Sequence, residues 1–211
     1  MQQVFDYDDD YSTEYRIRFN QAVAESRNLG FTRDPFVSEA STVGGDVLKS
    51  VSLLLGRFSG HLDMICPGYW GNSCQTLSTN IFAFLNAQGI PADIVIGNVI
   101  INGTDEFDTT PELIREEVTG TRPAEGPQSI HAWISVGDDT IIDAALPPRL
   151  AKYYGAPPKF NDMILIGRAS EFSVRHHLRY QPMVVGTEFF AKTNPPDPIE
   201  LLTAWKRQGK L

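Results

Sequence analysis

Hydrophobic residues follow a helical period most clearly between residues 74 and 88. Apolar side chains recur there three or four positions apart and would share one face of a helix. They are Leu77, Ile81, Phe84 and Leu85. Asn72 or Ser73 suits the cap at the start, whereas Gly89 and Pro91 prevent the helix from continuing. We therefore predict a helix that begins at Cys74 and packs its apolar face on a core.

The residues that follow this helix predict a β-sheet. Residues 92–101 are β-branched on both faces, which is typical of a strand in the interior of a sheet. Residues 130–136 and 140–143 predict two short strands, and the Gly-Asp-Asp segment between them predicts the turn of a β-hairpin. Three further strands, two of them at edges of the sheet, are expected within residues 163–166, 173–180 and 183–185.

Four more helices are expected around this sheet. Residues 14–28 have the helical period, and residues 199–208 predict a terminal helix. The helix that starts at Asp46 and has glycines near its end, at about residue 60, is apolar on much of its surface, so we expect it to be buried. Residues 110–118 begin with a capping Thr and a first-turn Pro, which predicts a short helix.

Between these elements the sequence predicts loops and a single domain. Residues 61–72 are expected to form a loop that leads to Cys74, and residues 119–128 are rich in Gly, Pro and Thr. The acidic residues 1–13 are expected to be flexible. The chain contains no repeat, so we predict one α+β domain over residues 1–211, in which N-terminal helices and a central helix pack on an antiparallel sheet.

Composition limits the classes of partner and the compartment. The chain has 211 residues, of which 42% are hydrophobic, and a formal net charge of -8, so it can bury a core but would be repelled by nucleic acid and by anionic membranes. No apolar run reaches the length of a membrane span, and the acidic start is unlike a signal peptide. Cys66 and Cys74 do not make a disulfide scaffold. We therefore expect a cytoplasmic protein with both thiols free, binding neither nucleic acid nor membrane.

Three residues from different predicted elements together have the chemistry of a cysteine nucleophile site. Cys74 lies in the first helical turn, where free N–H groups and the helix dipole favour a thiolate over a thiol. His131 begins one strand of the hairpin and Asp143 ends the other, so the two side chains are expected to be cross-strand neighbours. The carboxylate would then hold one imidazole nitrogen, and the other nitrogen would face the thiol across the helix–sheet interface.

Acyl transfer also requires hydrogen-bond donors for the oxyanion of a tetrahedral intermediate. The backbone N–H of Cys74 is one candidate donor. A second could come from the preceding loop, and the sequence does not choose between Tyr69, Trp70 and Asn72. Gln75 and Trp133 are further candidates for substrate contacts, although Trp133 is better explained as a packing residue.

Each candidate residue also has an ordinary structural interpretation. A lone cysteine in an amphipathic helix is more often a small buried residue, a lone strand histidine more often bonds to backbone, and a lone aspartate more often ends a turn. Together, at these spacings, Cys74, His131 and Asp143 favour a catalytic role over these structural interpretations. His176 and His177 lack Cys or carboxylate companions at ligand spacing, so we expect no metal site, and we expect no organic cofactor.

Four segments of this chain, in order, resemble the motif of the transglutaminase-like superfamily of cysteine enzymes. The first is Cys74 at a helix start, followed by the stop Ala87-Gln88-Gly89-Ile90-Pro91-Ala92. The others are His131-Ala132-Trp133 and Asp143, so the resemblance covers roughly residues 70–145. Two positions depart from it: Gln75 stands where many members have Trp, and Ala144 follows Asp143 where many have Pro or Thr.

The resemblance implies a papain-like α+β core with a Cys–His–Asp triad. Cys74 would be the nucleophile, His131 the general base and acid, and Asp143 the carboxylate that orients the imidazole. We expect a hydrolase or acyltransferase that attacks an amide of a peptide or protein substrate, and we prefer peptidase or amidase action because nothing in the sequence marks a site for an acceptor amine.

Two other classes of function stay open. Arylamine N-acetyltransferases and the maturation peptidases of lasso peptides share the triad topology, so the chain could instead take its acyl group from a thioester donor such as a coenzyme A derivative. Arg175, Arg179 and Lys192 are the cations that could meet the donor's phosphates, but no Gly-rich phosphate loop is present. The last alternative is a catalytically idle binding protein on the same fold.

Overall fold

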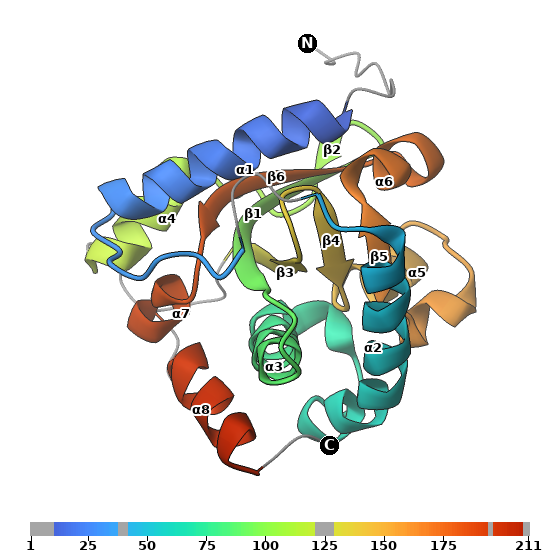
Figure 1. The fold of residues 1–211 in the computed structure, drawn as a ribbon. Helices are drawn as coiled ribbons and strands as arrows, with labels where there is room; N and C mark the ends of the chain where they lie inside the picture. The colour runs from blue at the N-terminus through green and yellow to red at the C-terminus, as the bar shows by residue number, and fades with distance from the viewer. Residues whose placement is uncertain (1–10, 38–41, 121–128, 194–195, 209–211) are drawn as a thin grey trace.

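A computed structural model describes residues 11–37, 42–120, 129–193 and 196–208. Within these residues the fold is α+β, as the sequence predicts: an antiparallel sheet has helices on both faces (Figure 1). The acidic residues 1–10 and most of the expected loop 119–128 lie outside the described part.

The sheet is built around β1 (Asp93–Ile101), the interior strand that the sequence predicts, and every residue of this strand is buried. On one side β1 pairs with β6 (Leu178–Val185), and on the other with β3 (His131–Ser135) and the two-residue β2 (Thr104–Asp105). The sheet continues from β3 to β4 (Thr140–Asp143) and then to β5 (Leu165–Arg168). The predicted hairpin is therefore confirmed as β3–β4.

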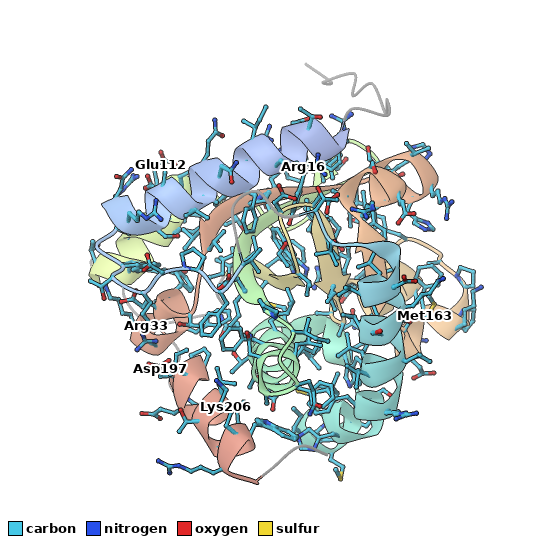
Figure 2. The ribbon with its side chains drawn as sticks, in the orientation of Figure 1. Arg16, Arg33, Glu112, Met163, Asp197 and Lys206 are labelled. Atoms are coloured by element: carbon cyan, nitrogen blue, oxygen red, sulfur yellow. The ribbon has the colours of Figure 1, made fainter. Side chains whose placement is uncertain are left out.

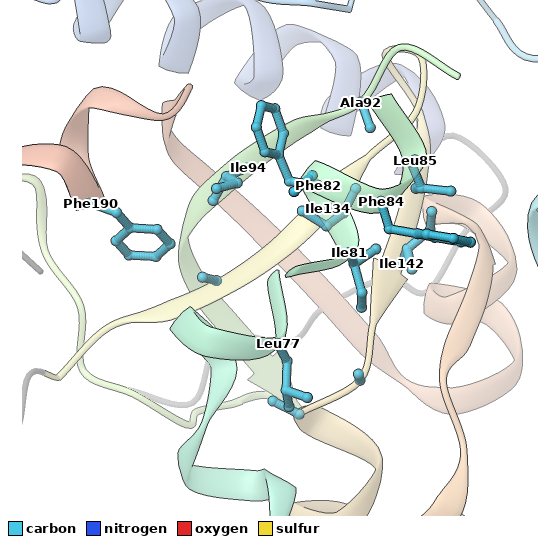
Figure 3. Packing of buried hydrophobic residues seen from close by; sticks show 14 of the residues in the cluster. Leu77, Ile81, Phe82, Phe84, Leu85, Ala92, Ile94, Ile134, Ile142 and Phe190 are labelled. Atoms are coloured by element: carbon cyan, nitrogen blue, oxygen red, sulfur yellow. The ribbon is translucent and has the colours of Figure 1, made fainter. Parts of the chain in front are cut away.

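One face of the sheet packs against α3 (Cys74–Ala87), the predicted central helix. Its apolar side chains meet Ala132, Ile134 and Ile142 of the hairpin in a single buried cluster (Figure 3). At the end of α3 the buried Asn86 side chain bonds to both the N–H and the carbonyl of Ala92. This amide fixes how the chain turns from α3 into β1. Two helices, α2 (Gly45–Ile65) and α8 (Pro198–Gln208), contact α3 from either side (Figure 1).

The other face of the sheet is covered by α1 (Tyr11–Asn28), which lies along β6 (Figure 1). Tyr15 and Phe19 of this helix are fully buried, and they belong to the same core cluster as Trp133 and Tyr180. Alternation along β3 therefore sends Ala132 and Ile134 toward α3, and Trp133 toward α1. Tyr11, expected to be flexible, is buried in the first turn of α1 because its ring packs on Tyr15.

Shorter elements fill the remaining connections. They are η1 (Trp70–Asn72), α4 (Pro111–Thr119), α5 (Leu146–Tyr153), η2 (Pro158–Asp162), α6 (Ala169–His176) and α7 (Glu188–Thr193). The helix predicted at 110–118 is confirmed as α4, with the Thr110 hydroxyl accepting from the N–H of Leu113 at 3.2 Å. Arg33 and Asp197, which lie beside each other in Figure 2, form an ion pair that joins the segment after α1 to the start of α8.

The prediction for α2 is wrong in two respects. The helix continues to Ile65, so residues 61–65 are helical and not part of a loop. Gly56 and Gly60 each destabilise a helix by about 1 kcal/mol. The turn between them carries Phe58, however, which stacks on Phe84 of α3 with ring centroids 4.0 Å apart. The helix is also only half buried: Leu53 is 69% and Met64 73% exposed, because α2 meets the core along one stripe.

The strand predicted at residues 173–180 is also wrong in its first half. Residues up to His176 belong to α6, and β6 starts at Leu178. His177 separates the two elements with a φ of 52°, a left-handed conformation that ends the helix. The two edge strands predicted at 173–180 and 183–185 are one continuous strand, β6, which among the described residues pairs with β1 alone and so lies at an edge of the sheet.

Candidate active site

Cys74 is the first residue of α3 and its side chain is partly exposed. Ser73 occupies the cap position but makes no side-chain capping hydrogen bond, so the capping predicted for Ser73 or Asn72 is not observed. The first bond of the helix runs from the N–H of Leu77 to the carbonyl of Ser73 at 2.9 Å. The N–H of Cys74 therefore belongs to the first-turn groups that have no partner within the helix.

Two contacts place α3 along strand β3. The thiol of Cys74 lies 3.8 Å from the carbonyl oxygen of Ile130, and one turn later the Ser78 hydroxyl donates to the carbonyl of Ala132 at 3.0 Å. Four residues of helix and two residues of strand each advance by about 6 Å, so the helix and the strand run side by side. Cys74 is thereby held next to the start of β3, where His131 lies.

His131 and Asp143 are hydrogen-bonded as the sequence predicts. Nε2 of the imidazole lies 2.6 Å from Oδ2 of the carboxylate, and both side chains are almost completely buried. The hairpin register pairs Ile134 with Ile142, which makes His131 and Asp143 diagonal neighbours on one face and not directly opposite residues. Oδ1 of Asp143 accepts from the backbone N–H groups of Ala145 and Leu146 at 2.9 and 3.0 Å.

The thiol and the imidazole come together at the end of the strand. His131 stacks with Trp133 on the α1 side of the sheet, and its imidazole interacts with the Cys74 thiol at the start of α3. Nδ1 of His131 is buried and has no hydrogen-bond partner among the described residues. The thiol of Cys74 lies between two acceptors: it is 3.8 Å from the Ile130 carbonyl oxygen, and it also interacts with the imidazole of His131. A rotation of the Cys74 side chain would bring its sulfur toward Nδ1.

The charge state of His131 is set by competing effects. Complete burial by itself lowers the pKa of His131, but the charge and the hydrogen bond of Asp143 raise it, and Cys74 adds to the rise. The net result is a pKa of about 9. The imidazole is therefore protonated at neutral pH, the state that accompanies a thiolate in a cysteine–histidine ion pair.

An aromatic side chain that the sequence analysis missed covers the imidazole. The ring of Phe107 stacks on His131 with 4.4 Å between centroids and 9° between planes. The Asn98 side chain holds the Phe107 segment, since its Oδ1 accepts from the Phe107 N–H at 3.2 Å. The guanidinium of Arg149 lies 4.9 Å from the Phe107 centroid. Phe107 follows a turn and has no periodic pattern, so no local signal indicated its role.

The loop before Cys74 contains the three candidates for a second oxyanion donor. The Trp70 indole is already used, because Nε1 donates to the carbonyl of Cys66 at 3.1 Å. Asn72 is exposed. The Tyr69 hydroxyl is buried and has no hydrogen-bond partner among the described residues. Its ring folds over Gly71 so closely that a Cβ on Gly71 would lie 2.4 Å from it. Of the three candidate side chains, Tyr69 is therefore the one whose donor is buried and has no partner among the described residues.

The remaining candidates are placed differently. Trp133 is fully buried, and its Nε1 donates to the Tyr15 hydroxyl at 3.0 Å, so the suggested substrate contact is wrong and its role is packing. Gln75 is half-buried in the first turn of α3. Cys66 is buried and both cysteines are free thiols. Among the described residues, no three His, Cys, Asp or Glu side chains gather where they could hold a metal ion.

Comparisons with known proteins add no relative to this picture. No protein-family model matches the chain, and neither the curated proteins nor the solved structures contain a match. The likeness to the transglutaminase-like superfamily therefore stays a prediction from the motif. Within the described segments, no helix has both the length and the apolar character needed to span a membrane.

Proposed function

We propose that this chain is a cysteine-dependent hydrolase or acyltransferase, a transglutaminase-like peptidase or amidase that acts through a thioester. The observation that carries the proposal is the pairing of His131 Nε2 with Asp143 at 2.6 Å, which leaves a buried Nδ1 without a partner on the histidine that interacts with the Cys74 thiol. Three chemically matched groups from α3, β3 and β4 meet at one place, and the cysteine among them is partly exposed.

The first half of the reaction would form the acyl-enzyme. In the proposed ion pair Nδ1 of His131 already holds the proton of Cys74, and the thiolate sulfur attacks the amide carbon of the substrate. The carbonyl oxygen becomes an oxyanion, for which the N–H of Cys74 and the Tyr69 hydroxyl are the donors we favour. The imidazolium then protonates the leaving nitrogen, the carbon–nitrogen bond breaks, and an amine departs while the acyl group stays on sulfur.

The second half would release the acyl group. Water, or an acceptor amine, gives a proton to Nδ1 and attacks the thioester carbon, after which the carbon–sulfur bond breaks and the sulfur leaves as the thiolate beside the imidazolium. Asp143 keeps the imidazole in one orientation throughout. A carboxylic acid is the product with water, and a new amide is the product with an amine.

Two of the three cations proposed for a phosphate-bearing thioester donor already have other contacts, whereas Arg175 is exposed. Arg179 pairs with Glu14 of α1 at 3.6 Å, and Lys192 lies 4.9 Å from the ring centroid of Phe31. These two cations are already engaged with α1 and the segment that follows it. We therefore retain peptide or protein amides as the proposed substrate.

Thiol labelling tests the proposal without a known substrate. We expect iodoacetamide at neutral pH to alkylate Cys74 much faster than Cys66, with peptide mapping to identify the site. Cys74→Ala should remove the fast reaction and all amide hydrolysis of a peptide library, whereas Cys66→Ala should keep both. If Cys74 reacts no faster than Cys66, and Cys74→Ala retains whatever hydrolysis is found, the enzyme proposal is wrong and an idle binding protein is favoured.

A further inference from the structure

The carboxylate of Asp143 accepts a hydrogen bond that lies outside the triad motif. The hydroxyl of Tyr180 donates to Oδ2 at 3.0 Å, and Oδ2 is also the oxygen that lies 2.6 Å from Nε2 of His131. Oδ1 is occupied by the two backbone N–H groups of the following turn. Within the part of the chain that the structure describes, Asp143 is thus held by four donors, of which Tyr180 comes from β6.

Tyr180 is itself held firmly in the sheet. Its side chain is fully buried and its backbone pairs with Val99 of β1. The ring packs edge-on against Trp133 with 5.1 Å between centroids, and the hydroxyl of Tyr11 donates to its carbonyl oxygen. Burial raises the pKa of Tyr180 well above 10, and Asp143 raises it further. The hydroxyl therefore keeps its proton and serves Asp143 as a donor over the whole working pH range.

We infer that Tyr180 is a positioning residue of the proposed active site. By fixing the Asp143 carboxylate it orients the imidazole of His131 and lowers the affinity of that imidazole for a proton. This inference rests on the proposed function. A carboxylate oxygen that accepts two hydrogen bonds offers less negative charge to each donor. Without the hydroxyl, Oδ2 would interact more strongly with the imidazolium, and the carboxylate would be free to turn about its remaining contacts.

The other titratable or charged groups near the imidazole do not replace the contact of Tyr180 with Oδ2. Cys74 faces His131 from α3, and Asp143 faces it from β4. On the far side of the Phe107 ring, Arg149 of α5 is paired with Glu106. Tyr180 is therefore the group that shares Oδ2 with the histidine, and it is the natural position at which to change the strength of the Asp143–His131 bond.

The test compares Tyr180→Phe with wild type by NMR titration of the His131 ring and by the pH dependence of Cys74 alkylation. We expect Tyr180→Phe to move the titration of His131 upward by about one pH unit and to lower the rate of amide hydrolysis about tenfold, the size expected for one hydrogen bond to a charged group. 3,5-Difluorotyrosine at position 180, a stronger donor, should move the titration of His131 downward.

Tyr15→Phe is the matched control. Tyr15 is as deeply buried as Tyr180, but its hydroxyl accepts from Trp133 and does not touch the triad. We expect this variant to lose stability with the His131 titration unchanged. An unchanged titration in Tyr180→Phe, or an equal change in Tyr15→Phe, would overturn the inference. Slow alkylation of Cys74 in wild type would instead overturn the proposed function, and the NMR titration would still report whether Tyr180 controls His131.

Discussion

The imidazole of His131 lies flat against the ring of Phe107, with 4.4 Å between centroids and 9° between the ring planes. Trp133 stacks on the same imidazole with 5.9 Å between centroids. The ring is therefore held by aromatic neighbours as well as by its hydrogen bond to Asp143. The freedom of the imidazole to turn away from Cys74 therefore depends on two residues, Phe107 and Trp133, that take no part in the proton transfer.

Replacing Phe107 by Leu should weaken this hold. Aromatic contacts of this kind are worth about 1 kcal/mol beyond buried area, so we expect the rate of Cys74 alkylation at pH 7 to fall about fivefold. Phe36→Leu is the matched control, because Phe36 packs edge-on against Phe82 and has no contact with the triad. Equal rates for Phe107→Leu and wild type would show that the stacking does not support the site.

Asp143→Asn should stop His131 from acting as a base while keeping the shape of the site. The two N–H groups at Oδ1 require an acceptor there, so the amide nitrogen of Asn would face Nε2 and force the imidazole proton onto Nδ1. We expect amide hydrolysis to fall by about four orders of magnitude, and NMR should show the pKa of His131 well below 9, because only Cys74 would then oppose the lowering by burial. Asp138→Asn, at the other end of the hairpin, should lose its ion pair with Arg16 and some stability but keep the His131 titration.

Ser78→Ala should destabilise the packing of α3 on β3. The Ser78 hydroxyl is buried and donates to the carbonyl of Ala132 at 3.0 Å, and a bond of this kind contributes about 1 kcal/mol. Thermal unfolding should show the midpoint lowered by about 3 °C. Ser50→Ala serves as control, since the Ser50 hydroxyl is exposed and bonds within its own helix. If both variants unfold at the wild-type midpoint, the Ser78 bond does not anchor the helix.

Asp93→Asn should change how stability depends on pH. Burial raises the pKa of Asp93 from 3.8 to about 7, against the backbone N–H groups of Val37 and Phe36, which lower it. Between these two values the folded protein keeps a proton that the unfolded chain has lost. The unfolded state then binds fewer protons, so the stability of the wild type falls as pH rises from about 4 to about 7.

The size of this effect is roughly 4 kcal/mol for a shift of about three pKa units. We expect the stability of Asp93→Asn relative to wild type to improve by that order between pH 4 and pH 8, as measured by urea unfolding at several pH values. A constant difference between the two proteins across this range would show that the Asp93 carboxyl does not titrate near pH 7.

His131 adds a second loss of stability at higher pH. Its pKa is raised from 6.5 to about 9, so its contribution is complete below about pH 6.5 and is lost as pH rises through 9. Asp93→Asn should leave this second decline in place, which separates the two groups in one set of unfolding curves.

Local patterns in the sequence were enough to determine the elements that carry the proposed triad. The helical period after Cys74, the stop at Gly89 and Pro91, and the short hairpin that joins His131 to Asp143 each depend on neighbours a few residues apart. Their geometry follows from backbone periods and turn chemistry, so the pairing of His131 with Asp143 could be predicted before any packing was known.

Only the tertiary structure decided what surrounds the triad. Tyr180 reaches Asp143 across 37 positions of sequence, and Phe107 reaches His131 from a turn with no periodic pattern. The extension of α2 past its glycines likewise depended on Phe58 meeting Phe84 of another helix. Contacts between distant segments are selected by how whole faces of the sheet and helices fit together, and that information is not present in the spacing of residues along one element.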